Sequence, residues 1–143
     1  MADEWRRGDY LISTDQSLLD LGVVHGFLSR SYWAAERPQE TVKRSIENSL
    51  SFGLYHGEDR QQVGFARVVT DFATFAWLCD VFVDEDHRGQ GLGVWLTETV
   101  VDHPQLSGMR LWVLGTRDAH SLYEKIGFVP LAAPEKWMEK RGC

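Results

Sequence analysis

A short run of glycines beside an arginine carries the clearest chemical signal of this sequence. Arg88-Gly89-Gln90-Gly91-Leu92-Gly93 follows an apolar run and opens a long helical pattern. Glycine lets the backbone approach an anion closely, and a helix start offers free N–H groups and the positive end of a dipole. The planar guanidinium of Arg88 suits phosphate oxygens. These residues therefore predict a binding site for a ligand that carries a diphosphate.

Two familiar phosphate-binding motifs do not match this loop. A Walker loop needs Lys-Ser or Lys-Thr after its last glycine, whereas Gly93 is followed by Val94 and Trp95. A dinucleotide-binding fold places an acidic residue about 20 positions after its glycines, and Val113 stands at that offset. From the residues alone, the remaining alternative is a plain tight turn between a strand and a helix.

The loop resembles the signature R/Q-x-x-G-x-G/A of the GNAT (general N-acetyltransferase) superfamily through Arg88, Gly91 and Gly93. A second segment, residues 116–128, is similar to that superfamily's N-x-x-A-x-x-L-Y-E-K-x-G-F sequence, with Thr116 in place of Asn. The chain thus resembles a small bacterial-type member. The resemblance implies an acetyl-CoA-dependent N-acetyltransferase that moves an acetyl group to a primary amine by direct attack in a ternary complex.

The resemblance also implies which residues bind the cofactor. The diphosphate of acetyl-CoA is expected on the backbone amides of residues 90–94, and the pantetheine arm is expected along the backbone of residues 81–83. A bulge there would separate two parallel strands, and one of its N–H groups would polarise the thioester carbonyl. The expected cofactor-binding residues are Val81, Phe82, Val83, Arg88, Gly89, Gln90, Gly91, Leu92, Gly93, Val94, Thr116 and Tyr123.

Two residues are expected to donate or accept a proton in the reaction. Tyr123 stands where the superfamily places its general acid, which would protonate the departing thiolate; the alternative is an aromatic side chain that packs on the sheet. Asp80 interrupts an apolar strand and is the candidate base, acting through water. The alternative for Asp80 is a structural hydrogen-bond acceptor for Arg67 or a neighbouring backbone group. Arg67 itself could bind an acidic acceptor or simply pair with an Asp.

Two aromatic residues in the connection between the first two helices, Tyr32 and Trp33, are candidates for the wall of the acceptor site. If they are exposed, they favour a hydrophobic or aromatic amine as the acceptor. Two other functions remain open from the sequence. One is a non-catalytic acyl-CoA-binding regulator of a protein partner, and the other is a protein lysine or N-terminal acetyltransferase.

Composition and charge exclude several classes of partner. A length of 143 residues fits a single domain, residues 1–143, and the net charge of -6 argues against nucleic acids and anionic membranes. The histidines show no metal-ligand spacing, so no metal is expected. The start of the chain lacks an apolar signal core, which favours a cytoplasmic protein. A homodimer is a hypothesis that rests on edge strands expected near Trp137.

Hydrophobic periodicity predicts an α/β domain. The expected strands are residues 10–13, 52–56, 63–69, 75–83, 109–114, 128–131 and 137–139, and the expected helices begin at Thr14 or Asp15, after Pro38, at Gly91 and at Asp118. The order β-α-α-β-β-β-α-β-α-β-β is that of the GNAT acyl-CoA N-acyltransferase fold. That fold implies a mixed central sheet whose fourth and fifth strands splay apart.

Overall fold

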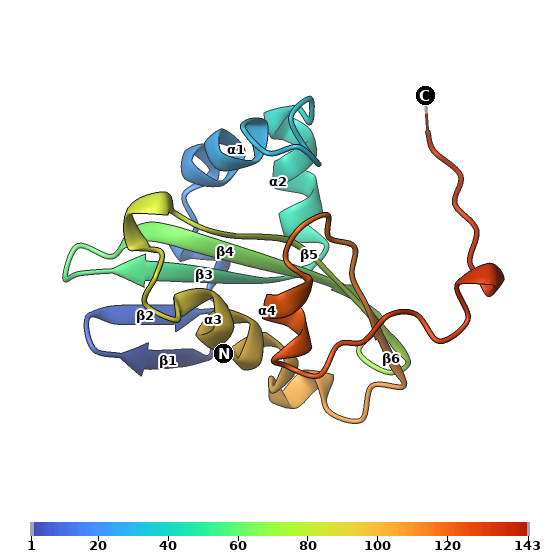
Figure 1. Ribbon diagram of the computed structural model, residues 1–143. Helices are drawn as coiled ribbons and strands as arrows, with labels where there is room; N and C mark the ends of the chain where they lie inside the picture. Colours follow the sequence, from blue (N-terminus) through green and yellow to red (C-terminus); the bar gives the residue numbers. More distant parts are fainter. Residues whose placement is uncertain (1, 143) are drawn as a thin grey trace.

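A six-stranded mixed sheet forms the centre of the molecule, with its strands side by side in chain order (Figure 1). The computed structural model describes residues 2–142. Neighbouring strands are antiparallel except β5 and β6, which are parallel because the chain crosses over through α3 between them. The strands are β1 (Glu4–Arg7), β2 (Tyr10–Ser13), β3 (Leu50–His56), β4 (Gln61–Thr70), β5 (Phe75–Val83) and β6 (Leu111–Val113).

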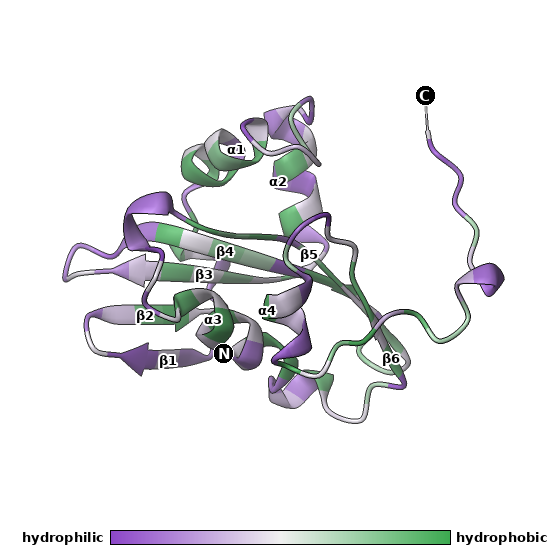
Figure 2. Ribbon diagram, in the orientation of Figure 1, coloured by the Kyte–Doolittle hydropathy of each residue, from purple (hydrophilic) through white to green (hydrophobic). Residues whose placement is uncertain are grey.

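Helices cover both faces of the sheet (Figure 1). One face carries α1 (Leu21–Ser29) and α2 (Gln39–Glu47), and the other carries α3 (Leu92–Val101) and α4 (His120–Glu124). Successive residues of a strand point to opposite faces, and the buried apolar side chains accordingly form two cores. Phe52 and Leu54 pack in the core that includes α3, whereas Phe65 and Phe82 pack in the core beneath α1 and α2. Figure 2 shows α1 and α3 as largely hydrophobic and the outer strand β1 as hydrophilic.

Several elements confirm the prediction from periodicity and turn residues. The strands Tyr10–Ser13 and Phe75–Val83 have the expected bounds, and α2 begins directly after Pro38. The hairpin between β3 and β4 turns at Gly57, which has a φ of 80°. Gly91 is the N-cap of α3 with a φ of 78°. Alternation and glycine placement are local signals, which is why they identify these elements well.

The first helix begins later than expected. Asp15 caps only the short 3-10 turn Gln16–Leu18, where its carboxylate accepts from the Ser17 N–H at 2.9 Å, and Leu19 is extended. The carboxylate of Asp20 then accepts from the Val23 N–H at 3.1 Å and starts α1 at Leu21. Two possible caps lie five residues apart, and the prediction chose the wrong one.

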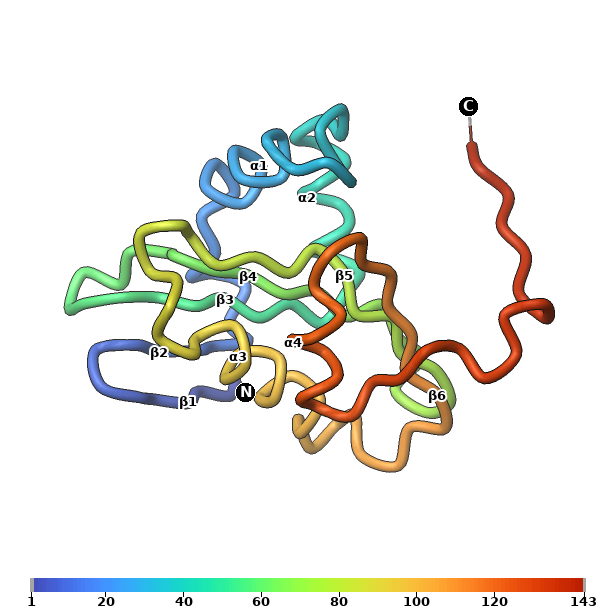
Figure 3. The backbone as a smooth tube through the Cα atoms, viewed as in Figure 1, coloured from blue at the N-terminus to red at the C-terminus, as the bar shows by residue number. Residues whose placement is uncertain are grey.

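The two predicted C-terminal strands, residues 128–131 and 137–139, are wrong. This part of the chain is irregular apart from the 3-10 turn Pro134–Lys136. Pro130, inside the first of these segments, lacks the N–H that a strand ladder needs. The tube in Figure 3 shows the chain passing β6 after α4 and running away from the sheet, so the expected order of the last elements is not observed.

An outer strand was not anticipated. Glu4–Arg7 pairs with β2 in an antiparallel hairpin that turns at Gly8, whose φ is 58°. Three of the four residues of β1 are charged, so the segment shows no apolar alternation. Charged side chains are typical of edge strands because they discourage pairing with other chains.

A bulge interrupts the pairing of β4 with β5. Phe65 faces Phe82 and Arg67 faces Cys79, so Ala66 alone stands opposite Asp80 and Val81. Asp80 has a φ of 52°, in the left-handed region that Asp and Asn tolerate better than most residues. A bulge is therefore present at Asp80 and Val81, at the start of the stretch 81–83 where it was expected. The expected separation of the two parallel strands stays a prediction. Within residues 2–142, no helix is both long enough and apolar enough to cross a bilayer.

Candidate active site

A cavity of about 740 Å³ opens at the end of β5. Its walls come from the connection between α1 and α2, the end of β5, the start of α3 and the start of α4. The lining residues are Phe27, Arg30, Ser31, Tyr32, Trp33, Val81, Phe82, Val83, Glu85, Arg88, Gly89, Gly91, Leu92, Gly93, Val94, Arg117, Asp118, Ala119, Leu122 and Tyr123. Segments far apart in the sequence thus meet at one concave surface.

The glycine loop lines part of this cavity. Gly89 and Gly91 have φ values of 82° and 78°, and a Cβ at either position would project into open space with nothing within 4 Å. The first N–H groups of α3 have no partner inside the helix and point out of its N-terminus. Arg88 lies beside them, and its Nε donates to the Val83 carbonyl at 2.9 Å. The loop presents N–H donors and a positive charge to an open space, which suits an anion.

Asp80 lies in the bulge and is almost fully buried. Its Oδ2 accepts from Arg37 Nη1 at 2.8 Å and from Arg67 Nε at 3.0 Å, and its Oδ1 accepts from Trp33 Nε1 at 2.9 Å. Only 2% of the side chain is exposed, and it does not line the cavity. These contacts match the structural alternative for Asp80, and its role as a base stays a prediction.

Arg67 is engaged by the same network. Besides Asp80, its guanidinium donates to Ser49 Oγ at 2.9 Å, and the side chain is 9% exposed. It is therefore buried in the sheet and does not line the cavity. Of the two interpretations of Arg67, the contacts match the pairing with an Asp.

Tyr123 lies on α4 in the wall of the cavity. Its ring packs edge-to-face against Phe128, with 6.0 Å between the ring centroids. Burial, and secondarily the nearby Tyr32, raises the pKa of the Tyr123 phenol to about 12. The phenol therefore keeps its proton at neutral pH, as a proton donor must.

Tyr32 and Trp33 are both exposed in the cavity wall, at 49% and 40%. The Tyr32 hydroxyl accepts from the Arg117 backbone N–H at 2.9 Å, and the Arg117 guanidinium stacks 3.9 Å from the centre of the Tyr32 ring. The connection between α1 and α2 is thus held against the segment that precedes α4. The exposed aromatic wall expected from the sequence is present.

Two of the expected cofactor residues lie apart from the larger cavity. The Gln90 side chain donates to the Tyr10 hydroxyl at 3.3 Å and to the His87 carbonyl at 3.2 Å. Thr116 Oγ1 accepts from the Ala119 N–H at 3.1 Å and lines a second cavity of about 250 Å³. Thr116 therefore supports the start of α4, whereas the other expected cofactor residues line the larger cavity.

The sequence analysis missed several residues of the larger cavity. Arg30 ends α1, Glu85 follows β5, and Arg117 and Asp118 precede α4. Of these residues, only Arg117 and Asp118 could have been predicted from the sequence, because they belong to the second motif, residues 116–128. Among residues 2–142, no three side chains of His, Cys, Asp or Glu are grouped so that they could hold a metal ion.

Comparisons with known proteins identify the family. Residues 49–130 match the model of the acetyltransferase (GNAT) domain. The chain is 32% identical to the provisionally assigned acetyltransferase FG08082 of Gibberella zeae over 86% of this chain and 81% of that protein.

Solved structures agree with this result. A provisionally assigned GNAT-family acetyltransferase from Xanthomonas campestris pv. campestris superposes with a TM-score of 0.88 at 46% identity, over 93% of each chain. The ribosomal-protein-S18-alanine N-acetyltransferase of Escherichia coli superposes with a TM-score of 0.65 at 26% identity, over 82% of this chain and 76% of that one. This chain, with its glycine loop at the start of α3 and Tyr123 on α4, belongs to the GNAT family of N-acetyltransferases.

Proposed function

We propose that the protein moves an acetyl group from acetyl-CoA to a primary amine by direct attack in a ternary complex. Membership of the GNAT family implies acetyl-CoA as the cofactor. One observation carries the rest of the proposal. The same cavity contains a glycine loop suited to phosphate, a protonated Tyr123 and an exposed aromatic wall.

The residues present fit the expected cofactor. The N–H groups of Leu92, Gly93 and Val94 at the start of α3 would hold the diphosphate, with the Arg88 guanidinium beside it. The absence of a Cβ at Gly89 and Gly91 leaves room for the phosphate oxygens. Bound there, acetyl-CoA supplies an acetyl group activated as a thioester.

The end of β5 would hold the pantetheine arm. β5 pairs with β6 through Phe75–Trp77 and Leu111–Val113, and we infer that the two strands separate beyond this point. That separation would leave the backbone of residues 81–83 open to the arm on the β6 side. The Val83 carbonyl already accepts from Arg88, so the N–H groups near the bulge are the better candidates to bond the arm and polarise the acetyl carbonyl.

The residues of the cavity and of the bulge would have different roles in the transfer. Tyr123 would give its proton to the departing sulfur, because its phenol is still protonated at the pH where the amine loses its own proton. The nitrogen, which becomes cationic on attack, would release a proton through water, and the Tyr123 phenolate would take up that proton and regain its starting state. We infer that Asp80 positions rather than reacts, since three donors occupy its oxygens. Tyr32 and Trp33 would bind an apolar or aromatic part of the amine.

Direct transfer is also favoured by the state of Cys79. Burial raises the pKa of its thiol to about 11, so the nucleophilic thiolate is scarce at neutral pH. Cys79 does not line the larger cavity either. An acetyl-enzyme intermediate on this cysteine is therefore disfavoured.

Calorimetric titration with acetyl-CoA, CoA and ATP tests the cofactor, and thiol release with a panel of primary amines tests turnover. We expect both CoA species to bind, ATP to bind much more weakly, and at least one aromatic or apolar amine to release thiol. Arg88→Ala should weaken binding, and Arg6→Ala, which removes an exposed arginine on β1, should not. Binding without thiol release for any amine would favour the non-catalytic regulator, and no binding would overturn the proposal.

A further inference from the structure

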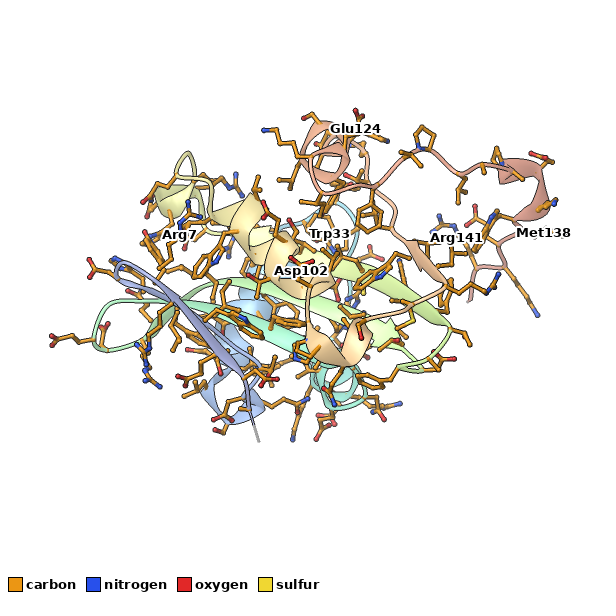
Figure 4. The ribbon with its side chains drawn as sticks, turned by 90° about the horizontal axis from the view of Figure 1, so that it is seen from below. Arg7, Trp33, Asp102, Glu124, Met138 and Arg141 are labelled. Carbon is orange, nitrogen blue, oxygen red and sulfur yellow. The ribbon has the colours of Figure 1, made fainter. Side chains whose placement is uncertain are left out.

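Arg30 is a cation of the larger cavity to which the proposed cofactor site gives no role. It directly follows α1 and lines the cavity together with Tyr32 and Trp33, which belong to the connection between α1 and α2. Trp33 is labelled in Figure 4. Helix α1 covers one face of the sheet and α3 covers the other (Figure 1). Arg30 therefore belongs to the wall on the α1 face, whereas the glycine loop opens the helix on the opposite face.

The other arginines that line this cavity are already engaged. Arg117 pairs with Asp118 at 3.3 Å, and Arg88 lies in the glycine loop, where the diphosphate is expected. Among residues 2–142, no carboxylate lies within ion-pair distance of Arg30, and this includes Glu85, the remaining carboxylate of the cavity. The charge of Arg30 is thus available to a ligand, together with the five N–H donors of its guanidinium.

Aromatic packing supports the guanidinium of Arg30. Its Cζ lies 5.7 Å from the centre of the Phe27 ring. Phe27 in turn stacks on the buried Phe82 of β5, with 4.0 Å between the ring centroids and 11° between the planes. A guanidinium over an aromatic face is a favourable contact that leaves its N–H groups available. A cation held in this way loses less conformational entropy when it binds an anion.

The chemistry of Arg30 indicates what it would bind. A planar guanidinium suits carboxylates and phosphates, to which it can donate two parallel hydrogen bonds. The neighbouring Ser31 cannot contribute, because its Oγ donates to the Leu28 carbonyl at 2.7 Å and accepts from the Ala34 N–H at 3.1 Å. The net charge of -6 gives the whole molecule no attraction for anions. Recognition of an anionic group on the α1 face would therefore depend on Arg30 itself.

We propose that the acceptor is an aromatic or apolar amine that also carries an anionic group, either a carboxylate or a phosphate. Arg30 binds this group, while Tyr32 and Trp33 bind the apolar part. The inference rests on the proposed function, because it names the substrate class of the same site. The anionic group takes no part in the transfer, so Arg30 binds it equally before and during the reaction. Arg30 therefore determines specificity, and its effect falls on KM rather than on kcat.

Three acceptors that share one benzylamine scaffold test the inference. They are para-(aminomethyl)benzoate, para-(aminomethyl)phenyl phosphate and the neutral para-(aminomethyl)benzamide. In thiol-release assays at least one anionic acceptor should have a KM about tenfold below that of the benzamide, and the preferred one identifies the anion. Arg30→Gln should raise that KM about tenfold and leave kcat and the benzamide KM within about twofold. Equal KM values for the three acceptors, or an equal effect of Arg30→Gln on all of them, would overturn the inference.

Arg44→Gln is the matched control. Arg44 lies in the last turn of α2, is exposed like Arg30 and does not line the cavity. The two variants each remove one positive charge from the C-terminal end of a helix, so a general effect on charge or helix stability would appear in both. Arg44→Gln should leave every KM unchanged. Arg30→Lys keeps the charge without the planar fork and should restore part of the affinity for the anionic acceptor.

Calorimetry separates this inference from a role of Arg30 in cofactor binding. The dissociation constant of acetyl-CoA should be the same in Arg30→Gln as in the wild type, and a weaker complex would assign Arg30 to the cofactor and overturn the inference. Thiol release with neutral amines but with neither anionic benzylamine would also overturn it, while the proposed function would stand. If acetyl-CoA binds but no amine releases thiol, the proposed function fails and the inference fails with it.

Discussion

The indole N–H of Trp33 donates to Asp80 Oδ1 at 2.9 Å, and this contact joins the wall of the cavity to the bulge of β5. Arg37, from the same connection between α1 and α2, reaches the other oxygen of Asp80 at 2.8 Å. One buried carboxylate therefore fixes both the expected acceptor wall and the strand that is expected to bind the cofactor. If the two substrates bind as proposed, their relative position depends on it.

Removal of this carboxylate should destabilise the fold strongly. Asp80→Ala leaves the guanidinium of the buried Arg67 without its anion, and breaking a buried pair costs about 3–5 kcal/mol. Asp118→Ala breaks the exposed pair with Arg117, where both side chains are 65% exposed, and should cost about 0–1 kcal/mol. Urea unfolding of both variants measures the difference in free energy of unfolding. Equal losses would show that Asp80 does not anchor the connection.

Asp80→Asn distinguishes a positioning role of Asp80 from a role as the general base. The amide keeps the size of the side chain and, like Asp, tolerates a positive φ at the bulge, but it loses the charge and cannot take a proton. If Asp80 only positions, kcat falls while the pH profile of kcat/KM keeps its wild-type shape. Loss of the acidic limb of that profile, measured in thiol-release assays, would instead identify Asp80 as the base.

Tyr123→Phe should slow turnover without weakening the cofactor. The phenylalanine ring retains the packing against Phe128, while loss of the proton donor is expected to lower kcat by about 100-fold. Calorimetry should show an acetyl-CoA dissociation constant within about twofold of wild type, a difference of about 0.4 kcal/mol. An unchanged kcat would assign the proton donor to another group.

The pH dependence of the wild type follows from the same phenol. Its pKa is raised from the ordinary value near 10 to about 12, so ionisation of Tyr123 is displaced to higher pH. Activity that depends on the protonated phenol is then retained through pH 10 and declines only as the pH approaches 12. A decline in activity between pH 8 and 10 that is seen in the wild type and absent from Tyr123→Phe would contradict the raised pKa of Tyr123.

Gly91→Val should weaken acetyl-CoA binding by filling the space that the diphosphate needs. Gly108→Val is the matched control. Gly108 has a φ of 74° against 78° at Gly91, and a Cβ at either position would meet no atom within 4 Å. Both substitutions impose backbone strain of about 1–2 kcal/mol, which the free energy of unfolding should show equally. Only Gly91→Val should change the calorimetric affinity. Equal affinities in the two variants would mean that the loop does not hold the phosphates.

Gly53→Ala tests the packing of β3. A Cβ at Gly53 would collide with the phenol of Tyr55, which is fully buried, so the substitution should destabilise by about 1–3 kcal/mol. Gly115→Ala meets nothing within 4 Å at an ordinary φ and is expected to be neutral or slightly stabilising. Thermal unfolding compares the two, and a neutral Gly53→Ala would mean that Tyr55 moves freely.

By itself, the sequence determined the elements whose signals are local. A run of aromatic and β-branched residues identified β5 with its bounds, and Pro38 and Gly91 marked two helix starts. The glycine loop and the segment around Tyr123 indicated the family and several of the residues that line the larger cavity. These features depend on backbone conformation and on side chains only a few positions apart, so a single sequence records them directly.

Only the tertiary structure decided how distant groups pair. Asp80 lies 43 positions from Arg37, and Tyr32 lies 85 positions from Arg117, so no local pattern could select these partners. The same holds for residues 128–139, which have apolar residues typical of strands but pair with no strand. A strand exists only where a second segment supplies its hydrogen bonds, and that depends on where the whole chain folds.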